Sequence, residues 1–296
     1  MAKIYMNLAA NLYAGGKFSE AKPLFEKALA IGYKAFGEEH PNTANCYNRL
    51  GLNIQALGKA AEATALYEKA LAIRLKVFGE EHADTAISYI NIAANAEELG
   101  NSVQSAQLNE KALAIQRVVL GEEHRDTAIS YNNIAIHLQN LGKLVEAQTL
   151  FKKSLAIRSK VLGDEHPETI TSYNNLAANL NAQGKFAEAQ PLFEKALAKH
   201  RKAVGEEHPI TATCYNNLAY NLYSQGKTTE AQPLYEKALA TRSKMLGEEH
   251  PDTAICHNNL GLNLKACGKI AEAQTHYVKA LSIRRKIRGE EHQTRL

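Results

Sequence analysis

The residues best suited to chemistry in this chain of 296 residues are a glutamate pair and a histidine that recur together. Gly-Glu-Glu-His returns every 42 residues, at 37–40, 79–82, 121–124, 163–166 (with Asp164), 205–208, 247–250 and 289–292. Carboxylate and imidazole groups both ligate zinc, at about 2.0–2.1 Å. Each copy offers one histidine, however, and packed helices lie roughly 8–10 Å apart, so two copies cannot share one ion. We therefore expect no metal site and assign the tetrapeptide to the start of a helix.

No other residues gather into a catalytic motif. His137, His200, His257 and His276 occur singly, without a nucleophile motif beside them, and a lone histidine is more often structural. Each Gly-Lys pair, such as the pair at 184–185, lacks the strand and the spacing of a phosphate-binding loop. We predict that this chain is not an enzyme, binds no cofactor and turns over no substrate.

Asparagine also recurs in register with the 42-residue interval, in three sets. An amide side chain both donates and accepts hydrogen bonds, and buried amides usually bond within the protein. We predict that the second and third sets form a structural ladder between neighbouring helices. The first set is Asn48, Asn132, Asn174, Asn216 and Asn258; the second is Asn91, Asn133, Asn175, Asn217 and Asn259; the third is Asn11, Asn53, Asn95, Asn179, Asn221 and Asn263.

A pair of helices, repeated along the chain, must position these residues. The constant interval, without insertions, is typical of one supersecondary unit stacked on itself. In the unit at 166–205, Pro167 suits a first helical turn, and apolar residues at helical spacing follow over 169–183. Gly184 ends that helix, a second helix is predicted over 186–204, and Gly205 ends the second helix.

Small and large residues alternate where two helices must approach closely, as interdigitated packing requires. The small residues are Gly51, Ala93, Ala135, Ala177, Ala219 and Gly261 on the first helix and Ala63, Ala147, Ala189, Ala231 and Ala273 on the second. The large residues are Phe25, Tyr67, Phe151, Phe193, Tyr235 and Tyr277. Repeat three departs from this pattern with Ser105 and Asn109, so we expect local opening to begin there.

Composition and charge indicate a soluble protein. The net charge is +4, from 35 basic and 31 acidic residues that intermix along the chain, so a polyanion partner is not favoured. Apolar runs are far shorter than the roughly 20 residues that cross a bilayer, and residues 1–3 lead directly into repeat sequence. We expect a cytoplasmic protein without membrane contact, whose four cysteines are reduced.

The pattern Leu176-Ala177, Leu180, Ala189, Phe193 and Ala196 resembles the tetratricopeptide repeat. With His-Pro-x-Thr before it and Gly-Lys-Phe-x-Glu-Ala within it, the unit resembles the longer, 42-residue kinesin-light-chain type. This resemblance implies an all-α fold: a right-handed superhelical solenoid of seven antiparallel helix pairs, with a concave groove that binds extended peptides. It implies one domain over 1–296, with repeats near 1–40, 41–82, 83–124, 125–166, 167–208, 209–250 and 251–292.

The same resemblance places the first asparagine set in the groove, where an amide can bond to a peptide backbone. It places further residues there: Thr171, Thr213, Tyr220, Tyr223, Gln139, Asn181 and Lys265. Tyr220 and Tyr223 lie three residues apart on one helix face and could anchor an apolar side chain or could simply pack.

We therefore predict a non-catalytic scaffold that binds a peptide segment of a protein partner in its groove. One alternative is a helical-repeat nucleic-acid binder, which the missing stripe of lysine and arginine disfavours. Another is a sensor or regulatory arm of a larger signalling enzyme whose catalytic domain lies outside this chain. End-to-end self-association through the terminal helices is a further expectation.

Overall fold

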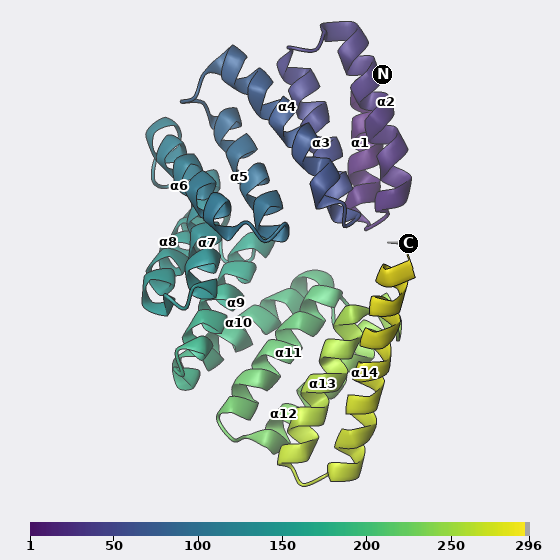
Figure 1. Ribbon diagram of the computed structural model, residues 1–296. Coiled ribbons are helices and arrows are strands. Elements are labelled where there is room, and N and C mark those ends of the chain that lie inside the picture. The colour runs from purple at the N-terminus through teal and green to yellow at the C-terminus, as the bar shows by residue number, and fades with distance from the viewer. Residues whose placement is uncertain (294–296) are drawn as a thin grey trace. The chain divides into compact units, whose positions relative to one another are not determined.

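The computed structural model describes the backbone of residues 1–293 and the side chains of residues 1–286, and every regular element in that part is a helix (Figure 1). The helices follow one another along the chain as the predicted seven pairs, which confirms an all-α repeat fold, and within each compact unit consecutive helices pack against one another. The helices are α1 Ala2–Ala14, α2 Phe18–Phe36, α3 Pro41–Ala56, α4 Ala60–Phe78, α5 Ala83–Glu98, α6 Ser102–Val119, α7 Arg125–Asn140, α8 Leu144–Leu162, α9 Pro167–Ala182, α10 Phe186–Val204, α11 Pro209–Ser224, α12 Thr228–Leu246, α13 Pro251–Ala266 and α14 Ile270–Gln293.

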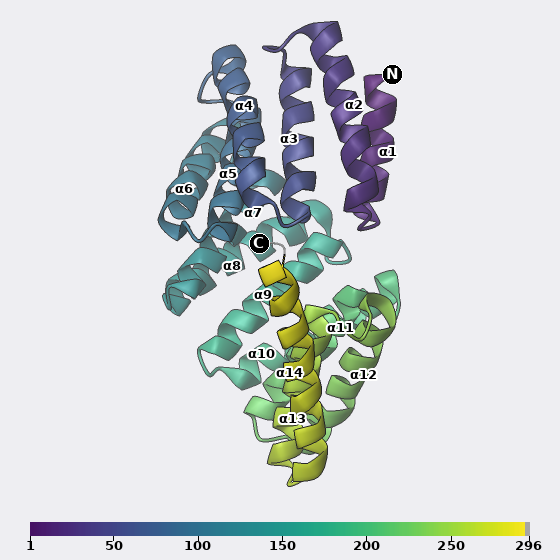
Figure 2. The ribbon, with the colours of Figure 1, turned by 45° about the vertical axis from the view of Figure 1, so that its right-hand side comes forward.

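The chain forms two compact units, at 1–141 and at 142–296. Within each unit, neighbouring helices stack along the chain order, as α13 against α14 illustrates in both ribbon views (Figure 2). One continuous right-handed solenoid over the whole chain stays a prediction. The last helix differs from the others, because α14 continues through Gly289 to Gln293, whereas the corresponding helices end before their glycine.

The recurring histidine caps the helix that follows it. In each of the six copies that precede a helix, the imidazole Nδ1 accepts the backbone N–H two residues further on, as His166 does from Glu168 at 3.3 Å. This bond satisfies one of the N–H groups that a helix start leaves unpaired. A threonine of the first turn also hydrogen-bonds to the loop that precedes the helix, as Thr211 Oγ1 donates to the Gly205 carbonyl at 2.8 Å. Helix-start chemistry therefore accounts for the histidine.

The two acidic residues of the tetrapeptide pair with side chains of the hairpin that they precede. Tyr173 of α9 and Lys195 of α10 both donate to Asp164, at 3.0 and 2.9 Å. Hydrogen bonds from Lys195, then from Ser159 and Tyr173, lower the pKa of the Asp164 carboxyl to about 2. The second acidic residue pairs with a lysine of the following second helix, as Glu207 does with Lys244 at 2.6 Å.

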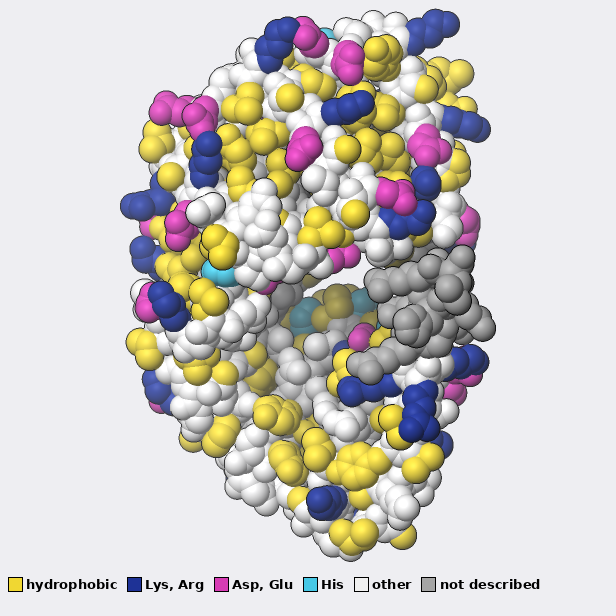
Figure 3. Space-filling model, in the orientation of Figure 1, with side chains coloured by type: hydrophobic (Ala, Val, Ile, Leu, Met, Phe, Trp, Pro, Cys, Tyr) yellow, Lys and Arg dark blue, Asp and Glu magenta, His cyan; other side chains and the backbone are white. Residues whose placement is uncertain are grey.

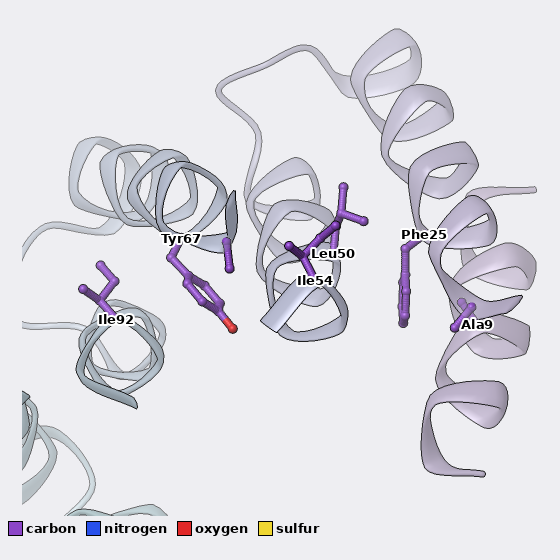
Figure 4. Close-up of a cluster of buried hydrophobic side chains, with 8 residues drawn as sticks. Ala9, Phe25, Leu50, Ile54, Tyr67 and Ile92 are labelled. Carbon is purple, nitrogen blue, oxygen red and sulfur yellow. The ribbon is translucent and has the colours of Figure 1, made fainter. Parts of the chain in front are cut away.

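Interlocking small and large side chains form the core. Figure 4 shows the ring of Phe25 between Ala9 of α1 and Leu50 of α3. Tyr67 lies between α3 and α5, and only 1% of it is exposed. A Cβ at Gly51 would lie 2.8 Å from the Tyr67 ring, so this close approach requires glycine. The alternation predicted from the sequence is the packing that the structure uses.

A second buried position joins each hairpin to the next. Arg74 of α4 donates to Asn45 of α3 and to Ser88 and the Asp84 carbonyl of α5, at 2.6, 2.8 and 2.9 Å. The equivalent residues along the chain are Gly32, Gln116, Arg158, His200, Arg242 and Arg284. Arg74, Gln116, Arg158 and Arg242 each hydrogen-bond to the first helix of the next hairpin, so these four side chains help to set the register between neighbours.

At this joining position, His200 makes stability depend on pH. Its side chain is buried, and burial, then the nearby charge of His208, lowers its pKa below 6.5. The unfolded chain therefore binds this proton first on acidification, so the stabilisation is complete above about pH 6.5 and is lost below it. We expect His200→Gln, which matches Gln116, to weaken the fall in stability between pH 7.5 and pH 5, measured by urea unfolding. An unchanged fall would contradict this role.

The four cysteines, Cys46, Cys214, Cys256 and Cys267, are free thiols, as predicted. The first three occupy the same place in their repeats and are buried. Burial raises the pKa of Cys214 to about 12 and that of Cys256 to about 11. These thiols are therefore protonated packing groups at neutral pH.

Candidate functional site

Within each unit, asparagines of the second set hydrogen-bond to asparagines of the first set across successive first helices. Asn217 of α11 donates to Asn174 of α9 at 3.1 Å, and Asn259 of α13 donates to Asn216 of α11 at 2.9 Å. In the other unit, Asn91 donates to Asn48 at 2.7 Å. The predicted structural ladder is confirmed for these members of the second set, and their partners are members of the first set, which the sequence analysis had treated separately.

Buried members of the third set cross-link their first helix to the preceding hairpin, also as predicted. Asn221 of α11 donates to the carbonyl of Phe186, the first residue of α10, at 3.0 Å, and to Asn181 of α9 at 2.8 Å. Asn263 donates in the same way to the Thr228 carbonyl at 3.0 Å, and Asn53 to the Phe18 carbonyl at 3.1 Å. All three donors are 0% exposed, so these bonds are internal.

The ladder also orients the amides of Asn174 and Asn216. Because each Oδ1 accepts from the next repeat, the Nδ2 group is turned away from that neighbour. Among the described residues, neither Nδ2 group donates a hydrogen bond, and both side chains are half-buried. Two amide donors on α9 and α11 are therefore left for an outside acceptor.

A pocket of about 380 Å³ opens beside this ladder, between α9, α10 and α11. Asn181 and Tyr220, both predicted as site residues, line it together with Asn217 of the ladder. Its other walls are largely apolar: Ala178, Ala182, Gly184, Phe186, Phe193 and Ser224. Tyr220 is 48% exposed, which is unusual for an aromatic ring next to a stacked helix. The pocket can receive an apolar side chain under the Tyr220 ring.

Tyr220 and Tyr223 stack on each other, with ring centroids 6.4 Å apart and an angle of 24° between the rings. Thr213, on the same helix, donates to the Pro209 carbonyl and accepts from Arg242, so it is engaged within the protein. Thr171 is exposed on α9 and donates to the Pro167 carbonyl at 2.9 Å.

The remaining predicted site residues are dispersed. Asn258 is half-buried and Lys265 exposed, both on α13. Asn48, Asn132 and Gln139 belong to the other unit, where the two asparagines are 7% and 8% exposed. The strongest concentration of predicted residues is thus on α9 and α11.

The small residue that makes the pocket, Ala178, is not among the predicted site residues. Ala178 is equivalent to Ala10, Leu52, Ala94, Ile136, Tyr220 and Leu262, so a small side chain stands where four of the seven repeats carry a large one. A comparison of the residues at this position in all repeats would have predicted a space beside Tyr220. The walls from Phe186 and Phe193 could not be found in this way, because both follow the ordinary core pattern.

The family to which the chain belongs follows from comparison with known proteins. The tetratricopeptide repeat model matches residues 1–63, 47–118, 126–202, 171–244 and 215–286. These matches cover most of the chain, so the protein belongs to the tetratricopeptide repeat family. No curated protein matches the sequence.

Solved structures place it among kinesin-light-chain-like repeats. A structure described as a kinesin light chain of Podosopora anserina, with nearly identical TPR-like repeats, is 31% identical over 70% of this chain and 98% of that chain, with a TM-score of 0.58. BtubC (BKLC) from P. vanneervenii is 24% identical over 79% of this chain and 92% of that chain, with a TM-score of 0.64. A Rap protein complexed with competence and sporulation factor shares the fold at 15% identity, over 95% of this chain and 76% of that chain, with a TM-score of 0.70.

Proposed function

We propose that this protein is a non-catalytic scaffold that binds an extended peptide segment of a protein partner along α9 and α11. The observation that carries the proposal is the combination of a pocket lined by an exposed Tyr220 with two amide groups, Asn174 and Asn216, whose Nδ2 atoms donate no hydrogen bond among the described residues. A side-chain pocket gives specificity, while amides that bond to backbone carbonyls give affinity that tolerates sequence variation.

The ligand is expected to present one apolar or aromatic side chain to the pocket. Tyrosine rings offer a large and rigid contact surface, and Tyr223 supports Tyr220 by stacking against it. Asn174 and Asn216 lie one repeat apart on adjacent helices, as backbone carbonyls of an extended peptide would require. A protein of the same fold was solved with competence and sporulation factor, which is consistent with ligand binding by such repeats.

The proposal is tested by selecting peptides on the full chain from a random displayed library and measuring their affinities. Ala178→Leu introduces the residue of Leu52 and Leu262 and should fill the pocket without disturbing the helix. We expect selected peptides to bind this variant, and Tyr220→Ala, at least about tenfold more weakly, because each change removes on the order of 1.4 kcal/mol or more of contact.

Ala198→Leu makes the same change at an exposed position of α10 and serves as the matched control. Its peptide affinity should equal that of the unmodified protein. Peptides that bind all four proteins equally would contradict the proposed site, and so would a failure of the library to yield any binder.

The alternatives stay predictions with less support. On the face in view in Figure 3, lysine and arginine side chains are interspersed with aspartate and glutamate, which does not favour a phosphate backbone as ligand. A regulatory role within a larger enzyme is compatible with the same peptide site. Among the described residues, no helix is long and apolar enough to span a membrane, and the reduced thiols are consistent with the proposed cytoplasmic location.

End-to-end self-association also stays a prediction. On α1, Ile4 and Leu8 are 67% and 50% exposed, whereas their equivalents on α3, Cys46 and Leu50, are 5% and 6% exposed. We expect sedimentation velocity to show concentration-dependent association that Leu8→Lys reduces. A sedimentation coefficient that does not change with concentration would contradict it.

A further inference from the structure

Two histidines meet in the last hairpin, at positions where every other repeat carries different residues. His257 of α13 replaces a tyrosine found at Tyr47, Tyr89, Tyr131, Tyr173 and Tyr215. His276 of α14 replaces a leucine found at Leu24, Leu66, Leu108, Leu150, Leu192 and Leu234. The two Nδ1 atoms lie 2.8 Å apart. Both changes bring a metal-ligating nitrogen to the same point.

Hydrogen bonding alone leaves this pair incompletely satisfied. One Nδ1 can donate to the other, but the Nε2 atom of His257 has no hydrogen-bond partner although the side chain is 3% exposed. The Glu248 carboxylate lies 4.0 Å from that Nε2 atom. In other repeats the corresponding acidic residue accepts the tyrosine hydroxyl, as Glu80 does from Tyr89.

The surroundings leave room for an ion. A pocket of about 620 Å³ is lined by both histidines, by Glu236, Glu248 and Glu272, and by Lys279 among others. Among the described residues, no three metal-ligating side chains are already gathered. Water from the pocket, or a rotated Glu236 or Glu272, would therefore complete the coordination.

We propose that His257 and His276 bind one divalent transition-metal ion, Zn²⁺ or a neighbour of it, through their Nδ1 atoms. Zinc–nitrogen bonds of about 2.0–2.1 Å at a tetrahedral angle require nitrogens about 3.3 Å apart, so the pair must open by only about 0.5 Å. The proton shared between the Nδ1 atoms moves to an Nε2 atom, so both ligands remain neutral. Glu248 then accepts the Nε2–H of His257, as carboxylates commonly do behind metal-bound histidines.

Burial and nearby charges both act on the two histidines. Burial lowers the pKa of both; the charges of His276 and Lys279 lower that of His257 further, and Lys279 lowers that of His276 further. The charge of Glu248 raises the pKa of His257, and the charges of Glu272 and Glu236 raise the pKa of His276. These three carboxylates also offset the charge of the ion and of Lys279.

The test is calorimetric titration of the chelator-treated full chain with zinc chloride. His257→Tyr and His276→Leu introduce the residues of the other repeats, so both variants should fold. We expect a tightest site of one zinc per chain that is at least about tenfold weaker in each variant. Glu248→Gln should weaken it by about tenfold, the usual effect of losing such a supporting carboxylate. Weaker binding to the helix-capping histidines should persist in all proteins.

His137→Asn is the matched control, because asparagine is the residue of Asn95 and Asn179 at that position, and zinc binding should be unchanged. Cobalt provides an independent readout: visible d–d absorption should develop on addition of Co²⁺ to the unmodified protein and be lost in His276→Leu. Equal zinc affinity and stoichiometry in the unmodified protein, His257→Tyr and His276→Leu would overturn the proposal.

Discussion

Tyr67→Ala is expected to lower the free energy of unfolding by about 3–5 kcal/mol. The ring is 1% exposed and fills the space between α3 and α5, next to Ile54 and Ile92 (Figure 4). Because Gly51 has no side chain to move into the gap, the cavity cannot collapse from that side. Urea unfolding followed by circular dichroism measures the loss.

Tyr67→Phe separates packing from hydrogen bonding. This variant keeps the ring and loses only the bond from the hydroxyl to Gln55, which is 2.7 Å long. It should cost only about 0.5–1.5 kcal/mol. If the alanine and phenylalanine variants were equally unstable, the ring would not be the main source of stability here.

Arg74→Ala is expected to cost about 2–4 kcal/mol at the junction of α4 and α5. The side chain is 3% exposed, and its guanidinium makes three hydrogen bonds to two neighbouring helices. Truncation removes both those bonds and the packing of the long stem. Stacked repeats unfold through their junctions, so hydrogen exchange in α5 should accelerate along with the loss in stability.

Arg74→Met separates the contribution of the aliphatic part of the side chain from that of the charged guanidinium. Methionine restores most of the apolar contact, although Asn45, Ser88 and the Asp84 carbonyl still lose this donor. It should therefore be clearly more stable than Arg74→Ala. Equal losses for the two variants would mean that the hydrogen bonds of the guanidinium, rather than its packing, hold this junction together.

Features that repeat were predictable from the sequence, whereas features that depart from the repeat were not. The 42-residue interval predicted the helix pairs, and the buried asparagines, such as Asn221, could be assigned to internal bonds from their amide chemistry. Their partners could not, because Asn217 reaches across to Asn174 only when two helices are placed side by side.

The candidate site depends on single changes in the repeat. Ala178 makes the pocket, and its effect is visible only beside Tyr220 of the next repeat. The sequence predicts that His257 and His276 are isolated histidines, because their separation of 19 residues gives no sign of contact. The antiparallel packing of α13 against α14 brings them together. The sequence period therefore predicted the helix pairs, whereas the pocket at Ala178 and the contact between His257 and His276 could be found only in the structure.

The most direct test of the account is hydrogen–deuterium exchange of the full chain with and without a selected peptide. The proposed site predicts protection of residues 167–182 and 209–224, which form α9 and α11, and little change in the outer helix α12. Protection confined to the second helices of the hairpins, or to residues 1–141, would contradict it.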